Sequence, residues 1–217
     1  MIVVTGAGGS LGPHVARRLA EDGHDLALVD TDAARMEGLP GEHHVVDLLD
    51  DAGTRAWAAG LQNVTGVAHL VGGWRGGKVV SEAPLEDWDA LHDLLIRTTQ
   101  HVTRQFAPAL KAAGEQGRFV IVSSEQAQAP TSTNAAYASA KAAAEAWTLA
   151  YAGELAETGG TANILVVNAI VTPEMREANP DKAYKTFTDA RHMADAIAFL
   201  CSESAGVMNG QRLSLHA

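Results

Sequence analysis

The sequence of 217 residues has a single cysteine, Cys201, and few aromatic residues, which make up 5% of the chain. One thiol excludes an intrachain disulfide and any thiolate metal site built from one chain. We interpret Cys201 as a small buried apolar residue. The nine histidines are scattered, and the neighbours His43 and His44 would point to opposite faces of a strand. We therefore predict no metal site.

Basic charge and long apolar runs are also scarce. Only 16 Lys and Arg stand against 26 Asp and Glu, for a formal net charge of −10. A nucleic-acid partner is not expected, because phosphate binding needs clustered basic side chains. The start, Met1-Ile2-Val3-Val4, resembles a strand and not a leader, and apolar segments stay well short of a membrane span. We expect no membrane partner and a cytoplasmic location.

Apolar runs that suit buried strands alternate along the chain with helical patterns, without repeats or low-complexity linkers. The expected strands lie at 2–4, 26–29, 44–46, 64–71, 119–122, 162–167 and 212–215. The expected helices lie at 13–22, 51–59, 84–113, 135–155 and 189–201, and residues 168–188 read as an irregular flap. This alternation predicts one α/β domain over residues 1–217, with a doubly wound parallel sheet.

A glycine-rich turn, Thr5-Gly6-Ala7-Gly8-Gly9-Ser10-Leu11-Gly12, joins the first strand to a helix that opens with Pro13. Glycines let a backbone approach a ligand closely, and free N–H groups at a helix start attract an anion such as a pyrophosphate. At a first strand-to-helix junction this pattern predicts dinucleotide binding, although a merely tight turn is the alternative. The predicted contacts in the turn are Gly6, Gly9, Ser10, Leu11 and Gly12.

Further cofactor contacts are predicted at the ends of the next strands. A carboxylate at Asp30 can accept hydrogen bonds from a ribose and would repel a 2′-phosphate, so NAD(H) is favoured over NADP(H). Asp30 could instead cap the following turn, and Arg35 is close enough to complicate the choice. Asp47, followed by Leu48, is placed to meet the adenine edge. Val71 and Gly72 end the fourth strand.

The segment Gly72-Gly73-Trp74-Arg75-Gly76-Gly77 surrounds one tryptophan and one arginine with glycines. Backbone freedom on both sides suggests a loop that approaches a ligand and moves. Trp74 is a candidate wall of the substrate site, and the alternative is that it plugs the loop against the domain.

Tyr137 and Lys141 are spaced to share one face of a helix, so both can reach a single bound molecule. Ser124 comes at the end of the preceding apolar strand. Because a strand end and a helix start would flank one pocket, we select Ser124, Tyr137 and Lys141 as catalytic candidates.

The glycine turn, Asp47, Ser124 and the Tyr137/Lys141 pair together resemble the short-chain dehydrogenase/reductase family over nearly the whole chain. The resemblance implies a three-layer Rossmann-type fold with a seven-stranded parallel sheet, and a nicotinamide dinucleotide bound at its carboxyl edge. It also implies homodimers or homotetramers formed through the two long helices.

The chemistry that this resemblance implies is the interconversion of a carbonyl and an alcohol on a small molecule. Tyr137 would act as acid or base, Lys141 would lower the tyrosine pKa and bond the nicotinamide ribose, and Tyr137 and Lys141 would thus both contact cofactor. Ser124 would donate a hydrogen bond to the substrate oxygen.

Three features depart from the family. The first turn has Ser10 where the best-known branch of the family has its middle glycine, and the spacing of Gly6, Gly9 and Gly12 looks more like the extended branch. Leu95 stands where an asparagine usually relays protons to the lysine, and Thr98 or His92 could replace that relay. The segment after Asn168 lacks the usual Pro-Gly turn, which leaves Thr172 to reach the nicotinamide amide or to serve as a simple turn residue. Met175 in the flap is a candidate substrate contact.

These departures keep other interpretations open. The glycine-flanked loop and Thr172-Pro173 resemble the dihydropteridine reductases locally. Leu95 and the short flap also allow an acid/base enzyme without net redox chemistry, such as an epimerase, dehydratase or cyclase. A catalytically silent NAD-binding sensor is a third possibility.

Overall fold

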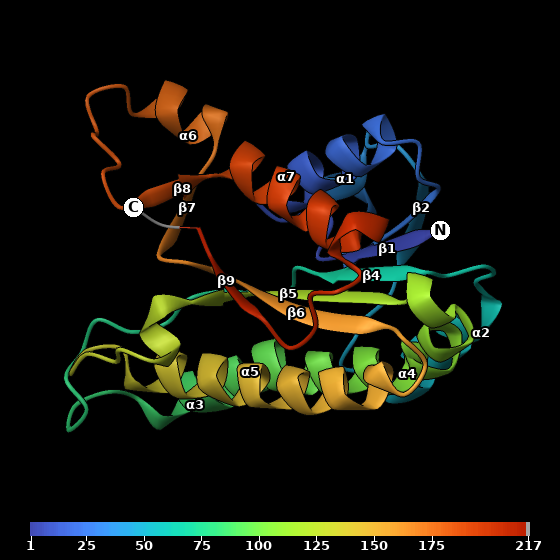
Figure 1. The fold of residues 1–217 in the computed structure, drawn as a ribbon. Coiled ribbons are helices and arrows are strands. Elements are labelled where there is room, and N and C mark those ends of the chain that lie inside the picture. The colour runs from blue at the N-terminus through green and yellow to red at the C-terminus, as the bar shows by residue number, and fades with distance from the viewer. Residues whose placement is uncertain (216–217) are drawn as a thin grey trace.

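A computed structural model describes residues 1–215. Its central sheet has seven parallel strands in the order β3-β2-β1-β4-β5-β6-β9 (Figure 1). The strands are β1 (Ile2–Thr5), β2 (Leu26–Asp30), β3 (Glu42–Val45), β4 (Gly66–His69), β5 (Arg118–Ser124), β6 (Thr161–Val167) and β9 (Arg212–Ser214). Every residue of β1, β2, β4 and β6 is buried, which is the reason these strands read as unbroken apolar runs. The predicted Rossmann-type sheet is confirmed.

Helices cover both faces of the sheet and complete three layers (Figure 1). On one face, α1 (Gly12–Glu21) and α7 (Ala190–Cys201) pack over Val4 and Leu28. On the other face, α2 (Asp51–Gly60), α4 (Thr98–Ala112) and α5 (Ala135–Ala156) pack over Val3 and Ala27. Successive strand residues point to opposite faces, so neighbours in one strand supply both cores.

Short 3₁₀ helices at Ala33–Met36, Gly114–Gln116, Glu125–Ala127 and Glu203–Ala205 complete the connections. Among residues 1–215, every helix is too short or too polar to span a bilayer.

The expected continuous helix at 84–113 is interrupted. It divides into α3 (Leu85–Leu91), a π-helical turn (His92–Arg97) and α4. The hydroxyls of Thr98 and Thr99 donate to the carbonyls of Leu94 and Leu95, each at 2.7 Å. These two hydroxyls bond to carbonyls one turn back, at the junction of the π-helical turn and α4, beside Leu95.

The flap is also more regular than expected. It contains β7 (Ala169–Val171), α6 (Pro173–Ala178) and β8 (Phe187–Asp189), and β7 pairs with β8 in a separate two-stranded parallel sheet. The flap projects beyond the main sheet on the side of α7 (Figure 1). Strands of three residues are too short to show a period, so the sequence pattern did not indicate them.

Candidate active site

Two adjoining cavities lie over the carboxyl ends of the strands. We call them the tyrosine cavity, of about 530 Å³, and the aspartate cavity, of about 240 Å³. Both are lined by Gly6, Gly9, Leu70, Val71 and Gly72, so they form one groove. The tyrosine cavity adds Ser10, Leu11, Gly12, Gly73, Trp74, Val122, Ser123, Gln126, Tyr137, Lys141, Val167, Asn168, Ala169 and Ile170. The aspartate cavity adds Val29, Asp30, Thr31, Arg35, Val46, Asp47, Leu48, Leu49, Leu94 and Thr98.

The glycine turn lies where the two cavities meet. Gly6 has a φ of +68°, and a Cβ there would lie 3.0 Å from the amide nitrogen of Val71. A Cβ on Gly12 would lie 2.2 Å from the carbonyl oxygen of Ala7, so only glycine allows this packing. Among the described residues, no side chain caps the first turn of α1. This helix start, with the close turn before it, fits a bound pyrophosphate.

Two of the three catalytic candidates, Tyr137 and Lys141, line the tyrosine cavity, and Ser124 lies behind that lining, beside Tyr137. Tyr137 lies in the first turn of α5, and Lys141 follows one turn later with its Nζ 5.9 Å from the centre of the Tyr137 ring. Ser124 ends β5, is 1% exposed, and hydrogen-bonds to Tyr137. Burial raises the pKa of Tyr137, and the Ser124 hydrogen bond opposes that shift. In the chain without ligand, Tyr137 is therefore a protonated phenol, the form that donates a proton.

Lys141 sits in a largely apolar setting. It is 7% exposed, and its ammonium donates to the carbonyl oxygen of Val122 at 2.7 Å. A Cβ placed on Gly72 would lie within 4.0 Å of both Lys141 Nζ and the side chain of Leu95. Burial lowers the pKa of Lys141 to about 8, although the carboxylate of Glu145 opposes the shift.

A buried histidine at the end of β4, His69, joins β1 to the first residue of α4. Its Nδ1 lies 2.7 Å from the hydroxyl of Thr5, and its Nε2 lies 3.3 Å from the hydroxyl of Thr98. Because Thr98 already donates to Leu94, the consistent tautomer donates from Nε2 and accepts at Nδ1 from Thr5. Burial, with help from the charge of Lys141, lowers the pKa of His69 to about 3. His69 is therefore neutral.

The two suggested replacements for the missing asparagine are engaged elsewhere. Thr98 is bonded to Leu94 and His69. His92 lies beside Asp93 and against the ring of Trp88. The sequence interpretation did not single out His69, because nothing local distinguishes a histidine that ends a buried strand.

The carboxylate of Asp30 forms one wall of the aspartate cavity. Its Oδ2 accepts from the Gly8 amide at 3.0 Å, and its Oδ1 accepts from the Thr31 amide at 2.9 Å. Arg35 Nη1 lies 3.4 Å from Oδ1. Asp30 thus braces the glycine turn and also makes the turn contact considered as its alternative role. Asp47 and Leu48 line the same cavity, and their contact with a cofactor stays a prediction.

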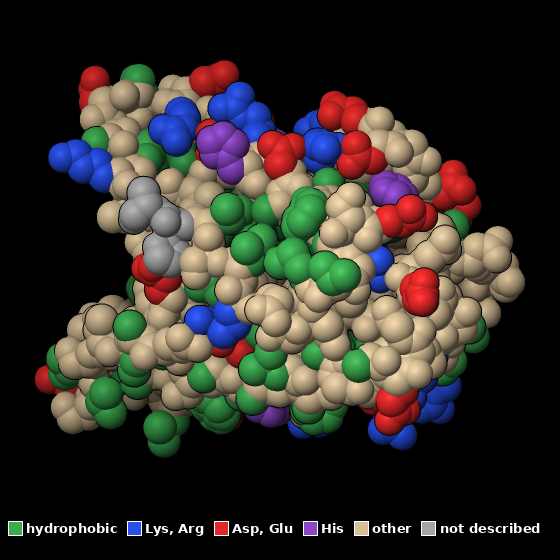
Figure 2. Space-filling model, viewed as in Figure 1, with side chains coloured by type: hydrophobic (Ala, Val, Ile, Leu, Met, Phe, Trp, Pro, Cys, Tyr) green, Lys and Arg blue, Asp and Glu red, His purple; other side chains and the backbone are tan. Residues whose placement is uncertain are grey.

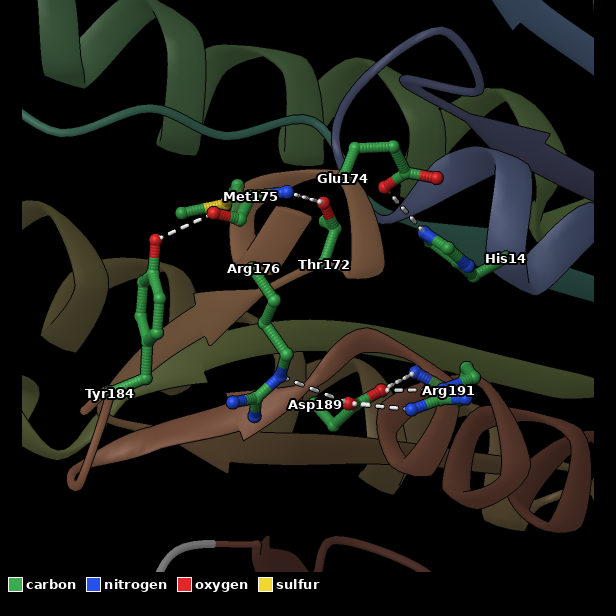
Figure 3. A network of polar contacts seen from close by, with 8 residues as sticks. All are labelled: His14, Thr172, Glu174, Met175, Arg176, Tyr184, Asp189 and Arg191. Atoms are coloured by element: carbon green, nitrogen blue, oxygen red, sulfur yellow. Dashed lines mark hydrogen bonds and ion pairs between the residues drawn. The ribbon is translucent and has the colours of Figure 1, made fainter. Parts of the chain in front are cut away.

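The flap residues selected from the sequence lie outside both cavities. The hydroxyl of Thr172 accepts from the Met175 amide at 3.2 Å and caps α6. The Tyr184 hydroxyl donates to the Met175 carbonyl at 2.9 Å (Figure 3). In this structure Thr172 holds the flap together, and its contact with a nicotinamide amide stays a prediction, as does the substrate contact of Met175.

Polar contacts lie between the flap and the helices beside it. Asp189 accepts from Arg191 at 3.0 and 3.1 Å and lies 3.7 Å from Arg176 (Figure 3). Chiefly through Arg191, this arrangement lowers the pKa of Asp189 to about 2. Across the gap to α1, His14 Nε2 lies 3.9 Å from Glu174. Figure 2 shows the molecule hollowed between the flap and the helical layer below it.

Trp74, the predicted substrate wall, lines the tyrosine cavity and is 59% exposed. Its ring packs near Gly76, and the Gly77 amide donates to the carbonyl of Thr133 at 2.8 Å. The loop is therefore attached at the turn before α5 and leaves the indole at the cavity mouth. Among residues 1–215, no cluster of three His, Cys, Asp or Glu side chains could hold a metal ion.

Comparison with known proteins agrees with this geometry. The family model described as short chain dehydrogenase matches residues 1–183. The (3R)-3-hydroxyacyl-CoA dehydrogenase of Mus musculus is 28% identical over 239 residues, covering 97% of this chain and 92% of the relative. The chain belongs to the short-chain dehydrogenase family of oxidoreductases.

Solved structures show the same fold. An NADPH-bound short-chain oxidoreductase of Pseudomonas aeruginosa PAO1, described as containing an atypical catalytic center, gives a TM-score of 0.88 at 21% identity. The match covers 99% of this chain and 94% of that one. An NAD⁺-bound xylitol dehydrogenase gives a TM-score of 0.82 at 20% identity, covering 99% and 96%.

Proposed function

We propose that this protein is an NAD(H)-dependent oxidoreductase that interconverts a carbonyl and an alcohol on a small molecule. The observation that carries the proposal is that Tyr137 and Lys141 line a cavity shared with the glycine turn, while Ser124, at the end of β5, hydrogen-bonds to Tyr137. A dinucleotide-binding turn alone would suit a protein that only binds the dinucleotide as well as it suits an enzyme. The phenol of Tyr137, the ammonium of Lys141 and the hydroxyl of Ser124 lie close together beside this cavity, and these groups suit acid/base chemistry on an oxygen atom.

Each of the three side chains has a defined task. Bound nicotinamide dinucleotide would supply or accept the hydride. Ser124 polarises the carbonyl oxygen, where negative charge develops, and Tyr137 donates a proton to that oxygen. In the reverse direction Tyr137 accepts the proton, and the nearby Lys141 ammonium stabilises the resulting phenolate.

The preference for NAD(H) rests on Asp30. Its fixed carboxylate would accept hydrogen bonds from ribose hydroxyls and would repel a 2′-phosphate. Arg35 reduces that repulsion, because its guanidinium lies beside the same carboxylate. Proteins of this fold have been solved with NADPH and with NAD⁺, so the preference is tested below on Asp30 itself.

For the substrate, the relative that acts on (3R)-3-hydroxyacyl-CoA makes 3-oxoacyl and 3-hydroxyacyl thioesters the first compounds to assay.

For assembly, we propose a homodimer or homotetramer formed through α4 and α5. An open cavity of about 650 Å³ between these helices and the 42% exposed Trp147 support this surface. Light scattering after size exclusion would report the assembly, and a monomer would refute it.

The catalytic assignment is tested with two matched substitutions on one helix. Tyr137→Phe should abolish turnover of a 3-oxoacyl thioester with NADH while the dissociation constant for NADH stays within about threefold, because only the reacting hydroxyl is lost. Tyr151→Phe is the control, since the buried Tyr151 hydroxyl has no hydrogen-bond partner among the described residues. It should keep full turnover. Normal turnover by Tyr137→Phe would contradict the assignment of Tyr137 as the acid/base group.

One observation favours a second candidate, an acid/base enzyme without net redox chemistry. Leu95 is 2% exposed and packs beside Gly72 and Lys141, where it can carry no proton. Formation of product with no change in nicotinamide absorbance would select this candidate over the oxidoreductase.

A further inference from the structure

A buried ion pair lies behind the catalytic lysine. Glu145 on α5 is 5% exposed. Its Oε2 accepts from Arg212 Nε at 2.8 Å, and its Oε1 accepts from Arg212 Nη2 at 3.1 Å and from the hydroxyl of Ser123 at 2.5 Å. Arg212 belongs to β9, which pairs with β6. The cluster therefore ties α5 to β5 and to the last strand of the sheet, and the chemistry described above makes no use of it.

The position of this cluster relates it to the catalytic groups on two elements. On α5, Glu145 follows Lys141 by one helical turn, so the two side chains are neighbours on one face. On β5, Ser123 lies between Val122, whose carbonyl accepts from Lys141, and Ser124. A displacement of Glu145 would therefore shift the positions of both the Lys141 ammonium and Ser124.

Charge adds to this mechanical link. The charged and titratable groups around Lys141 are Tyr137 and Glu145 on α5 and His69 on β4, with Arg212 on β9 behind Glu145. His69 is neutral, and the apolar Leu95 replaces a polar neighbour. Glu145 is therefore the group that opposes the loss of the Lys141 proton caused by burial.

We propose that Glu145, fixed by Arg212 and Ser123, is a positioning residue that holds Lys141 in its charged form and in place beside Tyr137. The inference rests on the proposed function for its catalytic meaning. The charge of Lys141 depends on the Glu145 carboxylate, which is bonded to β9, and this dependence needs neither substrate nor cofactor. Removing the Glu145 carboxylate should then lower the pKa of Lys141, and removing the Arg212 guanidinium should raise it.

The test is a pH titration of Lys141 in the chain without dinucleotide, followed by NMR of ¹³C-ε-labelled lysines. The chain has five lysines, and Lys141→Met assigns the signal. Glu145→Gln should lower the midpoint by about one pH unit, since the carboxylate one helical turn away favours the charged form of Lys141 and the amide does not. Arg212→Met should raise the midpoint, because Glu145 would then have Lys141 as its nearest counter-charge.

Glu154→Gln is the matched control, because Glu154 lies on the same helix but pairs with Lys111 near the surface. It should leave the Lys141 midpoint unchanged. An unmoved midpoint in Glu145→Gln would overturn the proposal, and so would a fall in Arg212→Met. If Glu145→Gln does not fold, Arg212→Met decides alone, with a rise supporting the proposal and no rise refuting it. No substrate is needed, so failure here is distinct from failure of the oxidoreductase assignment.

Discussion

Asp30→Asn is the substitution that tests cofactor choice most sharply. The aspartate accepts from two backbone amides, at 3.0 and 2.9 Å, through its two oxygens. An asparagine offers one oxygen, so its NH₂ group would face a donor, and the charge available to the ribose would be lost. Hydrogen bonds to a charged group contribute about 1.5–3 kcal/mol. The dissociation constant for NADH should therefore rise about 10- to 150-fold.

NADPH should respond differently to the same change. Removing the carboxylate removes its repulsion of a 2′-phosphate and frees Arg35, whose guanidinium can pair with phosphate. Binding of NADPH should stay constant or tighten in fluorescence titrations of both cofactors at one ionic strength. Asp32→Asn is the control, because Asp32 only caps the following 3₁₀ helix and should leave the NADH to NADPH ratio unchanged. An equal loss for both cofactors in Asp30→Asn would contradict the role of Asp30 in choosing between them.

Three further predictions concern the turn, the buried histidine and pH. Gly12→Ala places a Cβ against the Ala7 carbonyl, so it should destabilise the fold by about 1–3 kcal/mol in urea unfolding and weaken NADH binding at least about tenfold. His69→Leu leaves the Thr5 hydroxyl without its acceptor and should cost about 1–3 kcal/mol in the same assay. Because burial lowers the pKa of Lys141 to about 8, kcat/KM should hold below that pH and fall as pH rises through it.

Controls make these outcomes decisive. Gly60→Ala introduces a Cβ into open space on α2 and should leave NADH binding and stability nearly unchanged. An effect of Gly12→Ala no larger than that of Gly60→Ala would contradict the close packing of the turn. An unshifted urea midpoint in His69→Leu would show that the Thr5 contact contributes nothing. A kcat/KM that increases through pH 8 would contradict the role of the Lys141 ammonium.

Much of the fold could be predicted because its signals are local. Buried parallel strands appear as apolar runs, and the turn before Pro13 announces the first helix. The flap strands were missed because three residues show no period. The break at residues 92–97 was missed because the apolar spacing of the segment stays helical and does not distinguish a π-helical turn from an α-helical one.

The same distinction applies to the site. Tyr137 and Lys141 could be selected because one helix places them together. Ser124 could be selected because the end of an apolar strand can be recognised in the sequence. Glu145 and Arg212 could not, since they are far apart in the sequence and meet only when β9 joins the sheet. The Thr5–His69 contact likewise depends on the register of β1 with β4. Local patterns specify the groups that contact a ligand, and tertiary register specifies the groups that support them.

We propose that Tyr137 and Ser124 act on an oxygen whose carbon exchanges hydride with a bound nicotinamide. The most direct measurement is mass spectrometry of the product formed from a 3-oxoacyl thioester and NADH carrying deuterium at the transferable C4 position. We expect one deuterium on the new alcohol carbon with the unaltered chain, and no labelled product with Tyr137→Phe. Product that forms without deuterium, or without the cofactor, would contradict it.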